Sequence, residues 1–110
     1  MSMNQAEFET RRRKALAAIH QAAGTPAGED SIDLFIAHHL EELLPAYWQQ
    51  HLGSVTPAAA AVLGLLVLRE SWGDDDLENF DFTLPGDVTN YVVSVHFDAA
   101  GEVDRLDMES

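Results

Sequence analysis

The sequence predicts an α+β fold, with about three N-terminal helices packed on one face of a four-stranded antiparallel meander. Two observations support this prediction. Apolar residues recur at helical spacing before Gly64, and they alternate with polar residues after the turn-rich segment at residues 73–76. We expect a single domain over residues 1–110, mainly helical over 5–64 and an antiparallel sheet over 65–110.

The first two helices are predicted by apolar stripes. One helix is expected at residues 5–23, where Gly24 and Pro26 act as stop signals, and residues 25–29 form a linker. A second helix is expected to begin near Ser31. Its stripe follows the spacing i, i+3, i+4, i+7 through Ile32, Phe35, Ile36, His39, Leu40, Leu43 and Leu44.

Pro45 is expected to end or kink the second helix, because proline lacks an amide donor and disfavours helical geometry at Leu44. Residues 46–52 then form a further turn or two. A third helix is expected to begin at Pro57, capped by Thr56, and to end near Gly64. Residues 62–68 fit buried helix or buried strand equally well, so this boundary stays open.

Four strands are expected, at residues 65–72, 80–84, 91–97 and 102–108. Turn sequences separate them, including a hairpin turn at residues 98–101 that ends in a glycine. Short turns imply the strand order 1-2-3-4. The helices should then cover the face that carries Phe80, Phe82, Tyr91, Val93, Val95 and Phe97.

The composition excludes several kinds of site. The chain has no cysteine, which excludes disulfides, thiolate nucleophiles and cysteine-based metal centres. The longest apolar run, at residues 57–68, is shorter than the about 20 residues of a membrane span, and the N-terminus is too weakly apolar for a signal sequence. We expect a cytoplasmic protein that binds no membrane and no cofactor.

The formal net charge of −13 is unevenly distributed. Residues 55–110 hold twelve acidic residues against only Arg69 and Arg105, and so carry −10 of the total. Such a field repels phosphate backbones and attracts cationic molecules. We therefore expect no nucleic-acid binding and a cationic protein partner.

The acidic loop at residues 74–76 is the first candidate site. It lacks the glycine and glutamate positions of an EF-hand, so a solvated loop or a patch that meets a basic partner is favoured over a metal site. The residues predicted to bind the partner are Trp72, Asp74, Asp75, Asp76, Glu78, Asp81, Asp98, Glu102 and Asp104.

His38 and His39, followed by Glu41 and Glu42, form the second candidate. Adjacent histidines lie about 100° apart on a helix, whereas the zincin pattern needs them at i and i+4. A partly buried histidine bonded to a carbonyl is the favoured interpretation, although His51 could approach the same face. No catalytic or metal-binding residue is assigned.

Two further groups have structural explanations. The aromatic residues Tyr47, Trp48 and Trp72 are expected mainly in the core, and Trp48, which follows the proline break, is the one most readily placed at a surface. The basic run at residues 11–14 spans a whole helix circumference, so we expect it to pair with Glu7, Glu9 or the acidic sheet.

Residues 80–110 resemble the C-terminal half of a family of small acidic bacterial proteins known as a domain of unknown function. The likeness lies in the aromatic strand before Leu84-Pro85, in Thr89-Asn90-Tyr91, in the Phe97-Asp98-x-x-Gly101 hairpin and in Met108-Glu109-Ser110. This resemblance implies an architecture and no active site. In size and charge the chain is also similar to immunity proteins, which cover basic toxins.

Three functional hypotheses follow. The first is a non-enzymatic acidic protein-binding module, in its most concrete form an immunity or inhibitor protein for a basic toxin. The second is a small metal-dependent or His/Glu-based hydrolase that uses the histidines above. The third is a structural domain that self-associates through an exposed sheet edge, for example as a homodimer.

Overall fold

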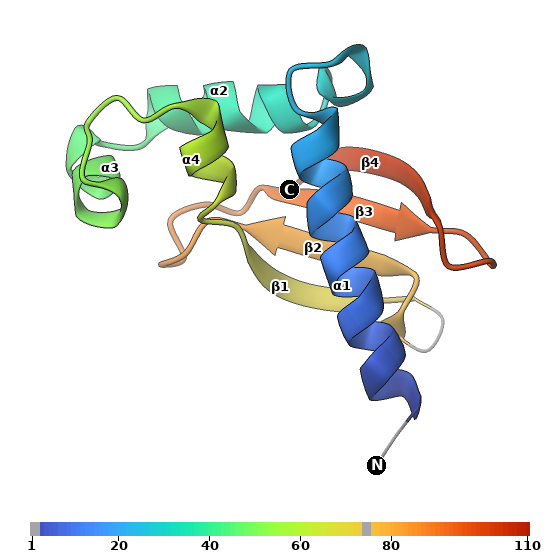
Figure 1. The fold of residues 1–110 in the computed structure, drawn as a ribbon. Helices are drawn as coiled ribbons and strands as arrows, with labels where there is room; N and C mark the ends of the chain where they lie inside the picture. Colours follow the sequence, from blue (N-terminus) through green and yellow to red (C-terminus); the bar gives the residue numbers. More distant parts are fainter. Residues whose placement is uncertain (1–2, 74–75) are drawn as a thin grey trace.

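The computed structural model describes residues 3–73 and 76–110, and within them the helices precede the strands (Figure 1). The helices are α1 (Met3–Ala22), α2 (Ile32–Glu42), α3 (Pro45–Leu52) and α4 (Ala59–Leu63), with a 3-10 turn, η1 (Pro26–Gly28), between α1 and α2. The strands are β1 (Val67–Trp72), β2 (Asn79–Thr83), β3 (Val92–Phe97) and β4 (Val103–Glu109). The predicted α+β class is confirmed. No helix in these two ranges is long and apolar enough to cross a membrane.

The strands form one antiparallel sheet in the order β1-β2-β3-β4, which confirms the predicted meander. The outer strands β1 and β4 each contain a bulge, since Arg69 and Asp104 are extra residues without a partner in the register. Bulges are common at sheet edges, where they bend and twist the strand. Between the bulges the register is regular, and side chains of the four strands align in rows across the sheet.

The helices cover one face of this sheet. Figure 1 shows α1 running across the strands, with α2 and α4 on the same side. The predicted inward-facing residues of β2 and β3 are buried here, namely Phe80, Phe82, Val93, Val95 and Phe97, while Tyr91 is half-buried. They join Ala15 and Ile19 of α1 and Ile32 and Phe35 of α2 in one hydrophobic cluster. Burial of this cluster from water is the main force that holds the helices on the sheet.

Pro45 separates α2 from α3, as expected, but the apolar stripe of α2 is shorter than predicted. Leu43 and Leu44 have extended backbone angles, which is the geometry that a following proline favours. The chain therefore leaves the helical path, and Leu44 is 74% exposed instead of buried. Leu40, also predicted on the buried stripe, is exposed as well. The stripe is confirmed from Ile32 to His39 and, in part, at Leu43, which is half-buried against the core.

The boundary between helix and sheet was predicted only in part. Thr56 and Pro57 lie before α4, which begins at Ala59 with Ala58 as its N-cap residue, so the predicted cap is wrong. The helix does end near Gly64, as predicted. Leu65 and Leu66 then continue in turns that bond back to Val62 and Leu63, and β1 begins at Val67 rather than at residue 65. Leu66 is buried and Leu65 is half-buried within these turns, which neither helical nor strand periodicity describes.

The two tryptophans lie in different environments. Trp48 on α3 is 1% exposed and belongs to the core cluster, which confirms the favoured core placement, although it was the aromatic residue most readily placed at a surface. The α3 helix is held to the sheet side by Tyr47, whose hydroxyl donates a hydrogen bond of 2.7 Å to the Pro85 carbonyl, and burial raises the pKa of Tyr47. Trp72, at the end of β1, is 47% exposed.

Candidate functional site

The face of the sheet that the helices leave uncovered, called the open face below, carries two polar rows across the strands. The first row runs Glu70, Asp81, Ser94, Asp107 from β1 to β4. The second row, beside it, runs Trp72, Asn79, His96, Arg105. Neighbours in a row lie about 4.5 to 5.5 Å apart between Cβ atoms, close enough for direct interaction. The open face is thus a polar surface with one large aromatic ring.

A shallow hollow of about 300 Å³, called the groove below, lies on the open face. Four carboxylates line it, from Glu70, Asp81, Asp107 and Glu109, together with Trp72, Asn79, Ser94 and Arg105. Asn79 is 3% exposed and Ser94 is 7% exposed, so these two small polar side chains form its floor. The longer side chains of Glu70, Trp72, Arg105 and Glu109 are exposed around them.

Two contacts organise the side chains of the groove. The Trp72 indole Nε1 donates a hydrogen bond of 3.0 Å to Asp81 Oδ2. The Arg105 Nε donates one of 2.7 Å to Asp107 Oδ2, in an ion pair whose side chains are about half exposed. The first contact fixes the edge of the indole and leaves the ring open to solvent. The second neutralises one of the four carboxylates.

The remaining charge in the groove is unbalanced. Glu70 lies directly opposite Asp81 in the register, and like charges in that position destabilise a sheet. Among the described residues neither carboxylate forms an ion pair. The groove therefore has a negative field that the protein itself does not compensate, next to an exposed aromatic ring. A cation placed there would gain from both features.

The predicted partner-binding residues are not brought together as one patch. Trp72 and Asp81 meet in the groove, whereas Asp74 and Asp75 lie outside the described residues. Asp76 is exposed in the β1–β2 connection. The other four lie elsewhere: Glu78 and Asp98 line a second hollow, Glu102 pairs with Lys14 at 3.1 Å, and Asp104 Oδ2 lies 3.2 Å from His96 Nδ1 without hydrogen-bond geometry.

The sequence reasoning missed six residues of the groove, namely Glu70, Asn79, Ser94, Arg105, Asp107 and Glu109. The signal for them was present in the alternation of the strands. Once Phe80, Phe82, Val93 and Val95 are assigned to the covered face, the residues between them must face the other way. The cross-strand register, which aligns these residues in rows, was not readable from the sequence.

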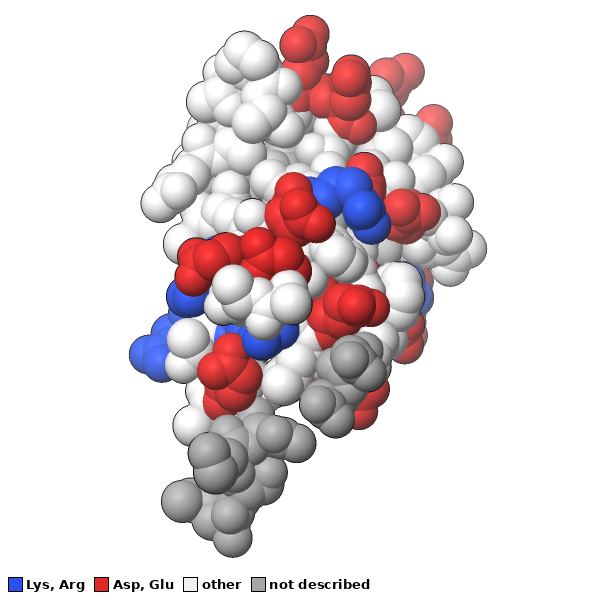
Figure 2. Space-filling model, turned by 90° about the vertical axis from the view of Figure 1, so that its right-hand side faces the viewer, with Lys and Arg blue, Asp and Glu red and all other residues white. Residues whose placement is uncertain are grey.

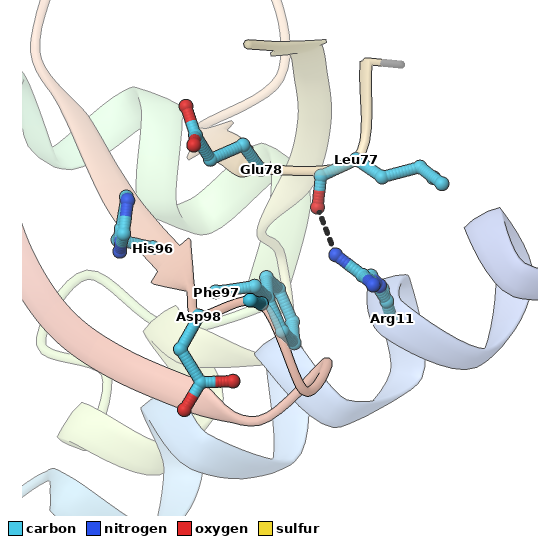
Figure 3. Close-up of a pocket in the computed structure, with 7 residues that line it drawn as sticks. Arg11, Leu77, Glu78, His96, Phe97 and Asp98 are labelled. Atoms are coloured by element: carbon cyan, nitrogen blue, oxygen red, sulfur yellow. Dashed lines mark hydrogen bonds between the residues drawn. The ribbon is translucent and has the colours of Figure 1, made fainter. Parts of the chain in front are cut away.

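The second hollow, of about 360 Å³, lies between α1 and the β3–β4 hairpin (Figure 3). Its Arg11 makes three contacts: Nε lies 2.6 Å from Glu7 Oε2, one terminal nitrogen donates to the Leu77 carbonyl at 2.8 Å, and the guanidinium carbon lies 5.4 Å from the centre of the Phe97 ring. Figure 3 shows the carboxylates of Glu78 and Asp98 pointing away from each other. Arg11 thus acts as a clamp that links α1 to the β1–β2 connection and to Phe97 of β3.

Replacing Arg11 with alanine should reduce the free energy of unfolding by about 1.5 to 3 kcal/mol, because the change removes one charged hydrogen bond within α1 and one from α1 to the Leu77 carbonyl in the β1–β2 connection. Urea denaturation followed by circular dichroism measures this loss. Arg13→Ala is the matched control, since Arg13 is exposed and forms only a 3.4 Å contact with the Glu9 carbonyl. Equal losses in both variants would contradict the clamp.

The side of the molecule around the β3–β4 hairpin is mixed in charge. Figure 2 shows lysine and arginine side chains next to acidic ones on this side. Besides Arg11, Arg12 lies 2.9 Å from Glu9 and Lys14 lies 3.1 Å from Glu102, so the basic run pairs with Glu7, Glu9 and the sheet as predicted. The acidic residues of the hairpin are therefore partly compensated by α1, unlike those of the groove.

The histidines of the second candidate are engaged in packing contacts and hydrogen bonds. His39 is 1% exposed, and both ring nitrogens are engaged, Nδ1 with the Phe35 carbonyl at 2.6 Å and Nε2 with Thr89 Oγ1 at 2.9 Å. This confirms the favoured interpretation of a buried histidine bonded to a carbonyl. His38 packs against Tyr91, and His51 packs against Tyr47. Within residues 3–73 and 76–110, no group of three or more potential ligands is placed to hold a metal ion.

Comparison with protein-family models, with curated protein sequences and with solved structures found no match. The candidate site therefore rests on the geometry of the open face alone.

Proposed function

We propose that this protein is a non-enzymatic binding module that holds a cationic protein against the open face of its sheet. The observation that supports this proposal is the groove, where four carboxylates surround an exposed indole and, among the described residues, only Asp107 has a cationic partner. An inhibitor or immunity protein for a basic protein would be its most concrete form.

The charge of the whole chain supports the same proposal. A net charge of −13 raises the encounter rate with a positively charged partner, and the benefit falls as salt screens the field over about 8 Å at physiological ionic strength. The groove then supplies the orientation. Complementary charge on an interface gives specificity and fast association more than it gives affinity. We therefore expect fast association that weakens steeply with salt.

Two double variants of equal net charge test the role of the open face. Glu70→Gln with Glu109→Gln neutralises two carboxylates of the groove, and Glu41→Gln with Glu42→Gln neutralises two exposed carboxylates of α2 on the covered side. Binding of a fluorescent arginine- and lysine-rich peptide is measured at low and high salt. The groove variant should bind about 2- to 30-fold more weakly, corresponding to two exposed ion pairs, and the α2 variant should bind like the original chain. Equal weakening of both variants would mean that only net charge matters and would refute the proposal.

Glu70→Gln alone should raise the stability of the fold while it weakens binding. The change removes the repulsion between opposed carboxylates on β1 and β2, which is worth about 0.2 to 1 kcal/mol in the free energy of unfolding. Urea denaturation measures this gain. Glu41→Gln serves as the control, because Glu41 lies on helix α2 and therefore does not oppose a carboxylate across a pair of strands. A loss of stability in Glu70→Gln would show that Glu70 serves the fold instead.

A further inference from the structure

The floor of the groove contains polar groups without partners. Asn79 and Ser94 are more than nine-tenths buried, and neither side chain forms a hydrogen bond with any described residue. Asp81 Oδ1 is completely covered and also has no partner within the described part of the chain. Buried polar groups in proteins are hydrogen-bonded in the large majority of cases, so each exception needs an explanation. Asp81 Oδ1 is such an exception, and it lies beside two small polar side chains that have no partner of their own, so donors from outside are expected here.

The acceptors in the groove outnumber its donors. Four carboxylates, the Asn79 carbonyl oxygen and the Ser94 hydroxyl can all accept hydrogen bonds, and the only cationic side chain that lines the groove is Arg105. Arg105 already donates to Asp107, which shows that a guanidinium can lie at this surface against one of its carboxylates. Glu70, Asp81 and Glu109 remain without a cationic partner among the described residues.

The exposed ring of Trp72 selects among the possible cations. Its N–H is held by Asp81 Oδ2, so the ring stands beside the carboxylates and keeps 47% of the residue's surface in solvent. A planar guanidinium can stack on such a ring and still direct its five N–H donors to several acceptors at its edge. An ammonium group has three donors, holds its water more strongly and cannot stack. Ring and acceptors together therefore favour guanidinium.

The size of the groove limits what it can hold. Small-molecule pockets span about 300 to 1,000 Å³, and the groove lies at the lower end with about 300 Å³. It is also shallow, and it opens on a flat sheet face. A single side chain fits such a hollow while the rest of a partner lies on the surrounding surface.

We propose that the groove binds one arginine side chain of the partner, stacked on Trp72 and bonded to the carboxylates and to the floor formed by Asn79 and Ser94. This inference rests on the proposed function, since it names the chemical group by which the cationic partner is recognised. Arg105 would be displaced toward Asp107 or the edge of β4 when the partner's arginine enters.

Two peptides that differ at a single position test the inference. Both carry the same glycine- and serine-rich sequence, one with a central arginine and the other with a central lysine, and each is titrated into the full chain and into the Trp72→Ala, Ser94→Ala and Glu70→Gln/Glu109→Gln variants. The indole N–H resonance of Trp72 reports on the groove, and the buried Trp48 serves as an internal reference. Free N-acetylarginine amide is titrated as a third probe.

The arginine peptide should bind about two- to fivefold more tightly than the lysine peptide and should shift the Trp72 resonance. Trp72→Ala should abolish this preference and leave the binding of the lysine peptide within about twofold. Ser94→Ala should weaken only the arginine peptide, and the free amide should bind more weakly than the peptide.

Three results would overturn the inference in distinguishable ways. Equal binding of both peptides, lost in the Glu70→Gln/Glu109→Gln variant, would refute the arginine site and leave the proposed function standing. If neither peptide showed binding that depends on these two glutamates, both proposals would be refuted. Binding of the free amide as tight as that of the peptide would show a small-molecule site and contradict a protein partner.

Discussion

Replacing Trp48 with alanine should reduce the free energy of unfolding by about 3 to 5 kcal/mol, the range for truncation of a large buried aromatic side chain. Trp48 is the largest fully buried side chain described, and it lies where α3 packs against the rest of the core. A loss of this size is a large part of the stability of a small domain. Urea denaturation followed by far-ultraviolet circular dichroism measures it without depending on tryptophan fluorescence.

Two further variants separate packing from other effects. Trp48→Phe should cost less than about 1.5 kcal/mol, because it keeps most of the ring volume and removes an indole N–H that has no hydrogen-bond partner among the described residues. Trp72→Ala is the matched control on the surface and should cost about 1 kcal/mol or less. If Trp48→Ala and Trp72→Ala were equally destabilising, Trp48 would not be the anchor of α3.

The fold could be predicted from the sequence where a pattern repeats. The stripe from Ile32 to His39 and the alternation of Phe80, Phe82, Val93 and Val95 each report a face that is buried along its whole length. The prediction was wrong where a proline or a turn changes the direction of the chain. Pro45 sends Leu44 into solvent, and Leu66 is buried within turns instead of within a regular element. Such events depend on tertiary packing, which local periodicity does not contain.

The candidate site was predicted only in part, for a related reason. Trp72 and Asp81 were identified because acidic and aromatic residues near the loop are conspicuous in the sequence. Glu70 and Asp107 were missed, because their significance comes from lying in one row with Asp81 across the sheet. A row is a property of register, and register is fixed by turns and bulges such as that at Arg69.

Replacing His39 with alanine should cost about 2 to 4 kcal/mol, the second largest effect that we expect. The change leaves a cavity beneath α2 and removes the partner of Thr89 Oγ1, which tethers the β2–β3 connection to the helix. Thr89 Oγ1 also accepts a hydrogen bond of 3.1 Å from the Tyr91 amide. His39→Gln, which can keep one of the two bonds, should cost less. Denaturation at neutral pH measures both losses.

His39 should also make the stability depend on pH. Burial lowers the pKa of His39 below its ordinary value of 6.5, and the nearby His38 acts in the same direction, although the hydrogen bond to the Phe35 carbonyl opposes them. The folded protein therefore keeps His39 neutral in a range where the unfolded chain binds a proton. Because the unfolded state then holds more protons, the free energy of unfolding should fall as the pH drops below about 6.5, until His39 is also protonated in the folded state.

Comparison with His39→Gln isolates this contribution from that of the carboxylates, which titrate at lower pH. The difference in unfolding free energy between the original chain and His39→Gln should narrow as the pH falls from 7 toward the folded-state pKa of His39. Only the original chain has to release a proton from residue 39 when it folds. His20→Gln, which changes an exposed histidine of α1, should leave the curve unchanged. A difference that stays constant with pH would mean that His39 is protonated equally in both states, and the hydrogen-bonded neutral ring between Phe35 and Thr89 would then be incorrect.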